Sequence, residues 1–600
     1  MNRWRRLVPG ARTASAIAGE LVAYVVTGLA MMWPLSFSLA SNIAGWQDAR
    51  YYSWLNWRVG RMLASGDLTL RIRDIVWPYG VDIRLLDGHL PTLIGGLWDV
   101  VAQPELAYNL GLLTAIGLNL WAGRRLGKAC SEHRAVWALT AIAFATAPAI
   151  AARLEVHFTM LFAFPLALLI EEAVRVGRGD HAIRPVRLAV LLVLAFLCGI
   201  YFLVFGGIAF AVIVLLGRDP REVPPMVLRA AAASLIAMVV LSPFLIARLQ
   251  IDSAERAAGR DPRQLENTFK ASADGLSLVT QPVSSTVDLP GMERLRQHFR
   301  RNIHESTIFP GFVLLLSVGG LLMLRSVLRW PLLFAALAMW LLALGTSAKI
   351  DGRFLLRGSD GAPVAWLPYT ALFEIPGLAN LRSPNRASFT LVAILAAAAA
   401  ICLGWLYSRF DRPWQQVAMT AGGGALLAMN LLVPIHHEPL VSSPALASAF
   451  RVVADRVRPG ESMIEVPADC PQTHTVEFQI FHRTPLVGCQ TSPAAIPWQS
   501  DLDAYKRSAA YAALRCRPGT IWRRVDVPFT RNERFDRSDL ESLREVFGAR
   551  FFLIERARLA GNGCRSVRGA VDVLEGFDVV GGDDEWTVID TGPIERPAPG

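Results

Sequence analysis

The sequence predicts a mainly α-helical, polytopic membrane protein that ends in a smaller domain of mixed α and β structure. Of its 600 residues, 53% are hydrophobic and only 18% are charged, and the mean hydropathy is +0.36; soluble proteins are usually more polar. From about residue 436 the hydropathy falls to that of a soluble domain. We therefore expect a transmembrane domain over residues 1–435 and an extracytoplasmic soluble α/β domain over residues 436–600.

About eleven apolar runs are predicted to cross the membrane, because each approaches the length that a helix needs to span ~30 Å of hydrocarbon. The first follows the basic start MNRWRR and is interpreted as an uncleaved helix, since no small-residue cleavage site follows it. Two neighbouring runs are read as separate spans with a turn at Cys198 to Tyr201. The eleven predicted spans lie near residues 14–35, 106–121, 135–152, 158–173, 188–200, 202–216, 226–247, 308–324, 330–345, 389–407 and 417–434.

The short connections between these runs predict the orientation. Segments such as GRRLGKACSEHR and RVGRGDHAIRPVR are rich in Arg, as cytoplasmic loops usually are. This places the N-terminus inside and the soluble domain outside, together with the long loops 36–105, 248–307 and 346–388, where we expect any chemistry. The net charge of +10 is explained by Arg facing anionic membrane lipid. No nucleic-acid motif accompanies it, so no nucleic-acid partner is expected.

The cysteine positions agree with this orientation. Three of the seven Cys lie in or beside predicted spans, and the other four fall in the soluble domain. An even number in an oxidising compartment favours disulfides, although three pairings and free thiols all stay open. The predicted disulfide cysteines are Cys470, Cys489, Cys516 and Cys564.

Two interfacial helices and several elements of the soluble domain are predicted from periodicity. In the first outer loop, Tyr52, Leu55, Val59 and Met62 recur at helical spacing, which predicts a helix over about 49–64; a second is expected over about 90–101. Downstream, SMIEVP, RFFLIE and EWTVID are typical of strands. The segments SPALASAFRVVADRVRPG and RSDLESLREVFG are typical of helices, the second opened by a Ser-Asp cap.

A series of short motifs, in order, resembles a known superfamily. The motifs are WQDARYYSWLNW, PYGVDI, PELAYNLGLL, RLEVHF, HESTIFPGF, IPGLANLRSPNRASF, FQIFHRTPLVG and VFGARFFLIE. They resemble bacterial integral-membrane glycosyltransferases of the GT-C superfamily, in the large, mostly uncharacterised multipass branch with an outer C-terminal domain. The resemblance implies transfer of a sugar from a polyprenyl-phosphate donor to an acceptor hydroxyl on a cell-envelope glycan, lipid or protein, at the outer face of a bacterial cytoplasmic (inner) membrane.

The expected chemistry needs a carboxylate to take the proton of the attacking hydroxyl and cations to stabilise the leaving phosphate. Asp48 matches the first-loop acid of the superfamily, although it would also suit a helix N-cap. Glu155 is the second candidate acid, with an ion pair to Arg153 as the alternative. No cofactor is fixed, and a divalent metal ion, Mg²⁺ or Mn²⁺, stays open with His157 as a ligand.

Further residues are candidates for substrate binding. Arg382 and Arg386 flank a Pro before the tenth span and would bind the donor phosphate together with the helix start; boundary Arg side chains that reach toward water are the alternative. Glu305 lies just outside the eighth span. Tyr52 and Trp54 could stack on the sugar or prenyl chain, or belong to an aromatic belt.

A non-catalytic membrane protein is the alternative to an enzyme. It would be a translocase of lipid-linked glycans or an assembly scaffold that keeps the fold. A translocase would be expected to place ionisable groups along its spans. Here the predicted spans are nearly free of them, which favours the glycosyltransferase.

Overall fold

The computed structural model divides the chain into two units. Unit 1 contains Met1–Leu39, Asp87–Ile94 and Asn109–His437, and unit 2 contains Ala40–Leu86, Gly95–Tyr108 and Glu438–Gly600. Unit 2 thus takes in two early segments besides the C-terminal one. The structure describes residues 11–45, 48–67, 69–257, 265–282, 291–296, 308–359, 361–375, 377–378, 381–410, 412–428, 434–441, 443–468, 476–487, 505, 508–516, 520–521, 525–526, 535–559 and 565–594.

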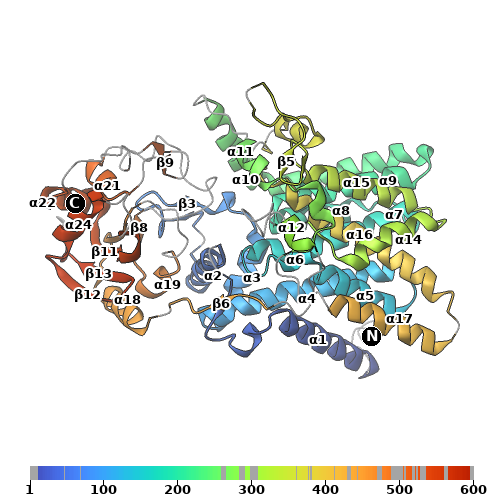
Figure 1. Ribbon diagram of the computed structural model, residues 1–600, viewed down its shortest axis with the longest axis horizontal. Helices are drawn as coiled ribbons and strands as arrows, with labels where there is room; N and C mark the ends of the chain where they lie inside the picture. Colours follow the sequence, from blue (N-terminus) through green and yellow to red (C-terminus); the bar gives the residue numbers. More distant parts are fainter. Residues whose placement is uncertain are drawn as a thin grey trace, which may run out of the picture. The chain divides into compact units, whose positions relative to one another are not determined.

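Unit 1 is built from α-helices, and a helix lies over each predicted apolar run (Figure 1). These helices are α1 (Ala11–Met31), α4 (Pro104–Cys130), α5 (Arg134–Ala145), α7 (Phe164–Arg178), α8 (Pro185–Cys198), α9 (Ile200–Gly217), α10 (Val223–Ala257), α14 (Phe312–Met323), α15 (Arg329–Ala343), α16 (Ala387–Tyr407) and α17 (Pro413–Ala428). Shorter elements of the unit include α6 (Pro148–Ala151), α11 (Leu265–Ala271), α12 (Met292–Arg296), β4 (Lys349–Ile350) and β5 (Arg353–Phe354).

Four helices of the described chain are long and apolar enough to cross a membrane: Pro104–Cys130, Ile200–Gly217, Pro220–Ser253 and Pro384–Tyr407. Five further apolar helices are shorter, at 10–17 residues. The protein is therefore mostly helical with apolar spans, while the predicted total of about eleven stays a prediction.

Helix boundaries differ from the predicted runs where the sequence contains Pro or Gly. The predicted turn near Cys198 is confirmed, since α8 ends at Cys198 and α9 begins at Ile200. The run 135–152 is broken, because α5 ends at Ala145 and a separate short helix begins at Pro148, where proline lacks the N–H that would continue the helix. The run 158–173 opens with a 3₁₀ turn, and its α-helix begins only at Phe164.

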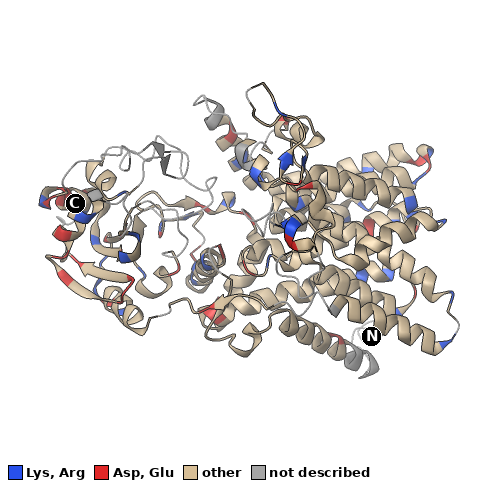
Figure 2. Cartoon of the chain, in the orientation of Figure 1, with Lys and Arg blue, Asp and Glu red and all other residues tan. Residues whose placement is uncertain are grey.

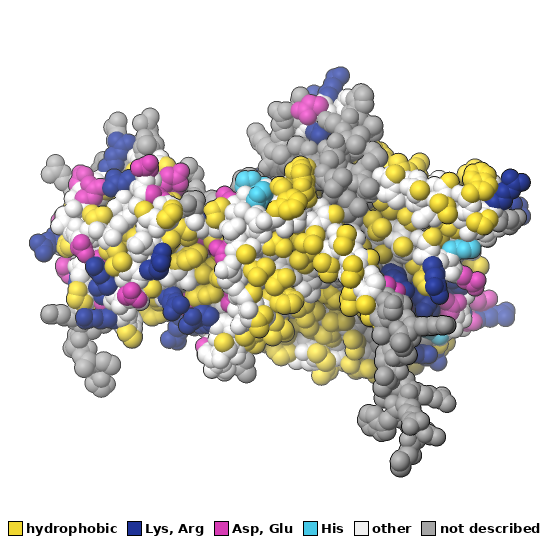
Figure 3. All heavy atoms as spheres, turned by 90° about the horizontal axis from the view of Figure 1, so that it is seen from below, with side chains coloured by type: hydrophobic (Ala, Val, Ile, Leu, Met, Phe, Trp, Pro, Cys, Tyr) yellow, Lys and Arg dark blue, Asp and Glu magenta, His cyan; other side chains and the backbone are white. Residues whose placement is uncertain are grey.

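The centre of unit 1 is α16. Its side chains from Ala387 to Ala400 are all buried, and it packs against α14, α15, α5 and α7. Small side chains such as the five consecutive alanines 396–400 let neighbouring helices approach closely. Figure 2 shows the bodies of α9, α14 and α15 without charged residues, and Figure 3 shows a broad hydrophobic surface over the helices. Val239 of α10 is 66% exposed, and exposed apolar side chains of this kind suit contact with lipid.

Unit 2 contains a five-stranded mixed sheet in the order β12-β13-β11-β7-β8. β7 pairs in parallel with β11 and β8, whereas β13 pairs antiparallel with β11 and β12. The three predicted strands are confirmed as β7, β11 and β13. The strands are β7 (Ser462–Val466), β8 (Leu486–Val487), β11 (Ala549–Glu555), β12 (Asp578–Gly582) and β13 (Trp586–Asp590).

Helices accompany this sheet. The two predicted helices are confirmed as α18 (Pro444–Arg456) and α22 (Arg537–Phe547). The cap of α22 is Asp536, in a capping box with Asp539, and lies earlier than the predicted Ser-Asp pair; Gly548 ends the helix in the left-handed conformation. Other helices of the unit are α19 (Gln479–His482), α21 (Ala509–Ala513), α23 (Arg556–Leu559) and α24 (Arg565–Leu574).

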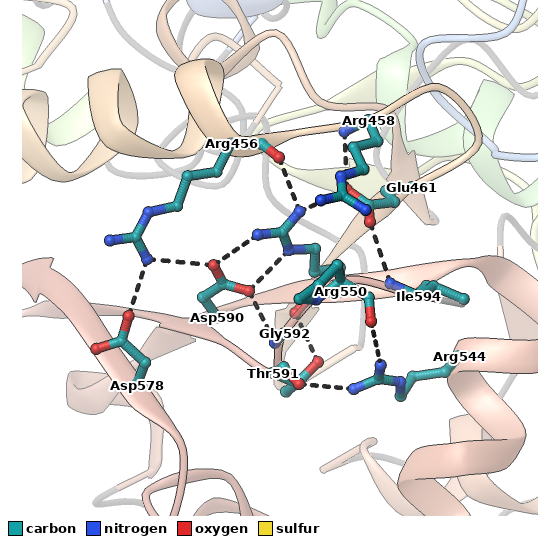
Figure 4. A network of polar contacts seen from close by, with 11 residues as sticks. Arg456, Arg458, Glu461, Arg544, Arg550, Asp578, Asp590, Thr591, Gly592 and Ile594 are labelled. Carbon is teal, nitrogen blue, oxygen red and sulfur yellow. Dashed lines mark hydrogen bonds and ion pairs between the residues drawn. The ribbon is translucent and has the colours of Figure 1, made fainter. Parts of the chain in front are cut away.

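A buried ionic network ties the sheet to the segments beside it (Figure 4). The Arg550 guanidinium donates to both carboxylate oxygens of Asp590, at 2.8 and 3.0 Å, and to Glu461 Oε2 at 2.9 Å. Its Nη1 also donates to the Arg456 carbonyl. Every charge here has an opposite partner, so the network has the character of a structural support rather than of a ligand site.

Candidate active site

Asp48 is the first residue of α2 (Asp48–Ser65), a helix of unit 2. Its side chain is half-buried. Asp48 and Tyr52, one turn apart, both lie within electrostatic range of the buried hydroxyl of Tyr108. A carboxylate in the first turn of a helix is stabilised by the N–H groups and dipole there, so the place suits an ionised acid.

Arg50 holds the start of α2 in place. Its side chain is 10% exposed and pairs with Glu438 at 2.7 Å and with the fully buried Glu477. The Arg50 Nη1 also donates to the Leu440 carbonyl at 3.2 Å. All of these partners come from the C-terminal part of unit 2. A guanidinium that bonds to several acceptors at once is held in one orientation. Arg50 therefore fixes the first turn of α2, in which Asp48 lies two residues earlier.

The aromatic residues of α2 belong mainly to the core. Trp54 is fully buried, and its indole N–H donates to Gln479 Oε1 at 2.5 Å. This places Trp54 in the packing of unit 2 instead of on a surface that could stack on a sugar. Tyr52 is half-buried and meets Tyr51 edge to face at 5.4 Å. Of the two predicted stacking residues, only Tyr52 retains an accessible ring.

The second predicted interfacial helix is α3 (His89–Val101), and α2 packs against its C-terminal half. A Cβ added at Gly95 would lie 2.3 Å from the Asn56 side chain, and one added at Gly60 would lie 2.9 Å from the Gly96 carbonyl oxygen. Glycine is therefore needed at this crossing. Because α2 is buried on most of its circumference, it is more enclosed than a helix that lies with one face in lipid.

Unit 1 contains a separate cationic cluster that the sequence analysis did not find. Asp87 precedes α3 and accepts a hydrogen bond from Arg248 of α10 at 2.8 Å. Burial alone would raise the pKa of the Asp87 carboxyl, but the charges of Arg248 and Arg386 lower it below its usual range. The guanidinium of Arg386 lies 4.6 Å from the centre of the Tyr201 ring. Two guanidiniums thus meet one carboxylate.

The predicted phosphate-binding arginines lie in different environments. Arg386 is half-buried and belongs to the cluster around Asp87, whereas the Arg382 side chain is exposed. The backbone N–H groups of Arg382 and Ser383, just before the helix start, donate to the Tyr201 hydroxyl at 3.1 and 3.2 Å. Tyr201 therefore lies beside the start of the predicted anion site, and binding of a phosphate by either arginine stays a prediction.

Glu155 and His157 lie in the turn between α6 and α7. Glu155 Oε1 accepts a hydrogen bond from the His436 backbone N–H at 2.6 Å, and His157 is 8% exposed. Arg153 is buried with its guanidinium 5.6 Å from the centre of the Phe389 ring. No group of three or more His, Cys, Asp or Glu in the described parts of the chain could hold a metal ion, so His157 as a ligand stays a prediction.

Several predicted residues lie outside the described residues, namely Glu305, Cys470, Cys489 and Cys564. Cys516 is disulfide-bonded. The described Cys of the helical unit, Cys130, Cys198 and Cys402, are free thiols. The pairing of the four outer cysteines stays a prediction.

The residues missed by the sequence analysis are Asp87, Arg248 and Tyr201. Two of them carried a signal. Asp87 stands in LLDGHLP directly before an apolar helix, and Arg248 follows the long apolar run of α10. Tyr201 was named only as part of a turn. Because these residues are far apart along the chain, only the folded structure shows that they meet.

Comparison with known proteins shows the fold. No family model matches the sequence, and no curated protein sequence matches it. Among solved structures, the arabinofuranosyltransferase AftD from Mycobacteria is similar with a TM-score of 0.55 and 14% identity, over 96% of this chain and 42% of that one. This chain therefore spans less than half of the length of that protein.

Two other solved structures are similar at lower scores. ArnT from Cupriavidus metallidurans has a TM-score of 0.49 and 12% identity, over 97% of this chain and 98% of that one. The archaeal oligosaccharyltransferase AglB from Archaeoglobus fulgidus has a TM-score of 0.46 and 12% identity, over 94% and 72%. The likeness to AftD extends over nearly the whole of this chain and shows that the two proteins share a fold.

Proposed function

We propose that this protein is a membrane glycosyltransferase that moves a sugar from a polyprenyl-phosphate-linked donor to an acceptor hydroxyl at the extracytoplasmic face of a bacterial inner membrane. The acceptor belongs to a glycan, lipid or protein of the cell envelope. The observation that carries the proposal is the fixed position of Asp48, at the first turn of a helix anchored by buried ion pairs of Arg50.

In this proposal Asp48 is the general base. An acceptor hydroxyl becomes a stronger nucleophile as its proton moves to the carboxylate, so that the oxygen attacks the anomeric carbon while the bond to the donor phosphate breaks. The first turn of α2 favours the ionised form of Asp48 before the reaction. A rigid anchor such as Arg50 keeps the carboxylate oriented, which lowers the entropic cost of reaching the transition state.

The donor phosphate is assigned to the cluster of unit 1. Arg386 and Arg248 provide two guanidiniums beside the carboxylate of Asp87, and guanidiniums are suitable ligands for a phosphate. Charge-assisted hydrogen bonds from guanidinium to phosphate stabilise the charge that develops as the lipid phosphate leaves. Glu155 and His157 are assigned a supporting role, either in shaping the charge around Asp48 or in holding a divalent metal.

The distribution of buried carboxylates supports an enzyme over a translocase. Glu171 and Glu172 are almost fully buried in α7. Glu171 pairs with Arg125 at 2.9 Å, and Glu172 pairs with Arg187 at 2.9 Å. Both carboxylates lie at the middle of α7, and each is neutralised by an arginine. A translocation path would need ionisable groups along its length.

The test is transfer by the purified full-length protein from radiolabelled polyprenyl-phosphate sugars, with wild type compared with Asp48→Asn. We expect the variant to lose about 10²- to 10⁴-fold in kcat, the usual contribution of a general base. Asp578→Asn, a carboxylate change on an exposed strand of the same unit, is the matched control. Full activity of Asp48→Asn would rule out Asp48 as the base, and failure of every donor would rule out the enzyme.

A further inference from the structure

An arginine-rich pocket lies in unit 2. It has a volume of about 260 Å³ and is lined by Trp57, Arg58, Arg61, Ser65, Asp74 and Arg483. Asp48 and Trp57 are nine residues apart on α2, which places them on opposite sides of the helix at 100° per residue. The pocket is therefore distinct from the place assigned to the reacting hydroxyl, although both belong to the same helix.

The cation at the wall of this pocket is held in place. Arg58 donates to Asp74 Oδ2 at 2.6 Å. The backbone carbonyl of Asp74 accepts hydrogen bonds from Gln479 Nε2 at 2.6 Å and from the Leu486 N–H at 2.8 Å. The loop that carries Asp74 is thus joined to the C-terminal part of unit 2, so Arg58 is oriented before any ligand arrives.

Arg483 reaches the pocket from an unfavourable backbone conformation. It follows α19 as the C-cap with φ 54° and ψ 17°, in the left-handed region where Gly or Asn is the usual residue. Its N–H donates to the Gln479 carbonyl at 2.9 Å. A residue with a Cβ in this conformation costs stability, and such costs are typical of functional positions. What Arg483 adds is an exposed guanidinium in the pocket.

The charges of the pocket favour an anion. Three guanidiniums line it against the one carboxylate of Asp74. Within the described residues, Arg61 and Arg483 form no ion pair; Arg61 stacks on the Trp57 ring, 5.5 Å from its centre. Like charges around one small volume repel one another, and a bound carboxylate or phosphate removes that repulsion.

The lining also limits the kind of anion. Apart from the Trp57 ring, its lining side chains are polar or charged, so an acyl chain would find little apolar surface to pack against. Ser65 and Asp74 offer polar groups to hydroxyls, and the volume lies below the roughly 300–1,000 Å³ of pockets for drug-sized ligands. We propose that this pocket binds an anionic sugar residue of the acceptor, a uronic acid or a sugar phosphate. The inference rests on the proposed function, because it names the class of acceptor.

The experiment measures equilibrium binding of an oligogalacturonate to the full-length protein in detergent, by isothermal titration calorimetry, beside a neutral oligosaccharide of the same length. We expect the anionic oligosaccharide to bind at least tenfold more tightly. Arg483→Gly and Arg61→Gln should each weaken it tenfold or more. Arg483→Gly suits its backbone conformation, so its thermal midpoint should not fall. Arg451→Gln, an exposed Arg of α18, is the matched control and should bind as wild type does.

Three results would overturn the proposal. The first is equal binding of the neutral and anionic oligosaccharides, and the second is unchanged binding by Arg483→Gly and Arg61→Gln. The third is binding to phosphatidylglycerol vesicles that is weakened by Arg483→Gly and Arg61→Gln, together with no binding to the oligogalacturonate. This result would assign the pocket to a lipid headgroup. Asp48→Asn should bind the oligosaccharide normally. If the wild-type protein bound the oligosaccharide but transferred sugar from no donor, the result would count against the proposed function and leave the pocket standing.

Discussion

The two candidate regions are built in opposite ways. In unit 2, Asp48 opens a continuous helix and is fixed by Arg50, only two residues away. In unit 1, the cluster of Asp87, Arg248 and Arg386 joins a loop, the end of a long helix and the start of another. In the first region the acid and its helix have a local signature in the sequence, although Arg50 finds Glu438 and Glu477 far along the chain. In the second region every contact depends on the folded chain. Mutations should therefore affect the two regions differently.

The largest effect should come from Arg50→Ala. Removing the guanidinium leaves Glu477 buried without its charge partner, which costs about 3–5 kcal/mol of folding free energy. Thermal unfolding in detergent, followed by circular dichroism, measures this loss. Arg50→Lys keeps the charge without the fork and should lose less. If Arg50→Ala were as stable as wild type, α2 would not depend on this anchor and the local account of unit 2 would fail.

That local character explains what the sequence could predict. The acid Asp48, the helix that follows it and the strands β7, β11 and β13 were expected from short segments, because cap residues, helical spacing and apolar runs are encoded locally. Trp54 shows the limit of such patterns. Its helical spacing was visible, but its burial depends on Gln479, more than 400 positions later.

The cluster of unit 1 was only half predicted for the same reason. Arg386 was expected from its place before the tenth span, while its partners Asp87 and Arg248 were not. A single sequence gives no sign that residues 87, 248 and 386 come together. The Tyr201 hydroxyl also accepts hydrogen bonds from the N–H groups of Arg382 and Ser383, a contact that no local pattern indicates.

A pair of variants compares the two predicted phosphate cations. Arg386→Gln removes a half-buried guanidinium of the cluster, and we expect KM for the lipid-linked donor to rise about 10- to 100-fold, the equivalent of one charge-assisted hydrogen bond. Arg382→Gln removes an exposed charge, so the rise should be below about threefold. Steady-state transfer kinetics give both values. An equal rise in KM for the two variants would mean that membership of the cluster around Asp87 does not make Arg386 the phosphate-binding residue.

The smallest effect concerns Asp99, on α3 at its contact with α2. Burial raises the pKa of the Asp99 carboxyl from 3.8 to about 6, although the charge of Arg61 opposes the shift. The folded protein therefore binds this proton more tightly than the unfolded chain does. Ionising Asp99 costs folding free energy, so its contribution to stability falls as pH rises from about 4 to about 6 and then stays constant.

Asp99→Asn removes that cost. At pH 7.5 the variant should be more stable than wild type by about 1 kcal/mol, since solvent screening reduces the full value for a partly exposed group. At about pH 3, below both pKa values, the two proteins should unfold at nearly the same temperature, because Asp99 is then mostly neutral in the folded and the unfolded protein. Thermal unfolding at the two pH values measures the difference. If Asp99→Asn stabilised the protein equally at both pH values, its effect would come from packing against Gly60 and not from charge. The contact between α2 and α3 would then not depend on the protonation of Asp99.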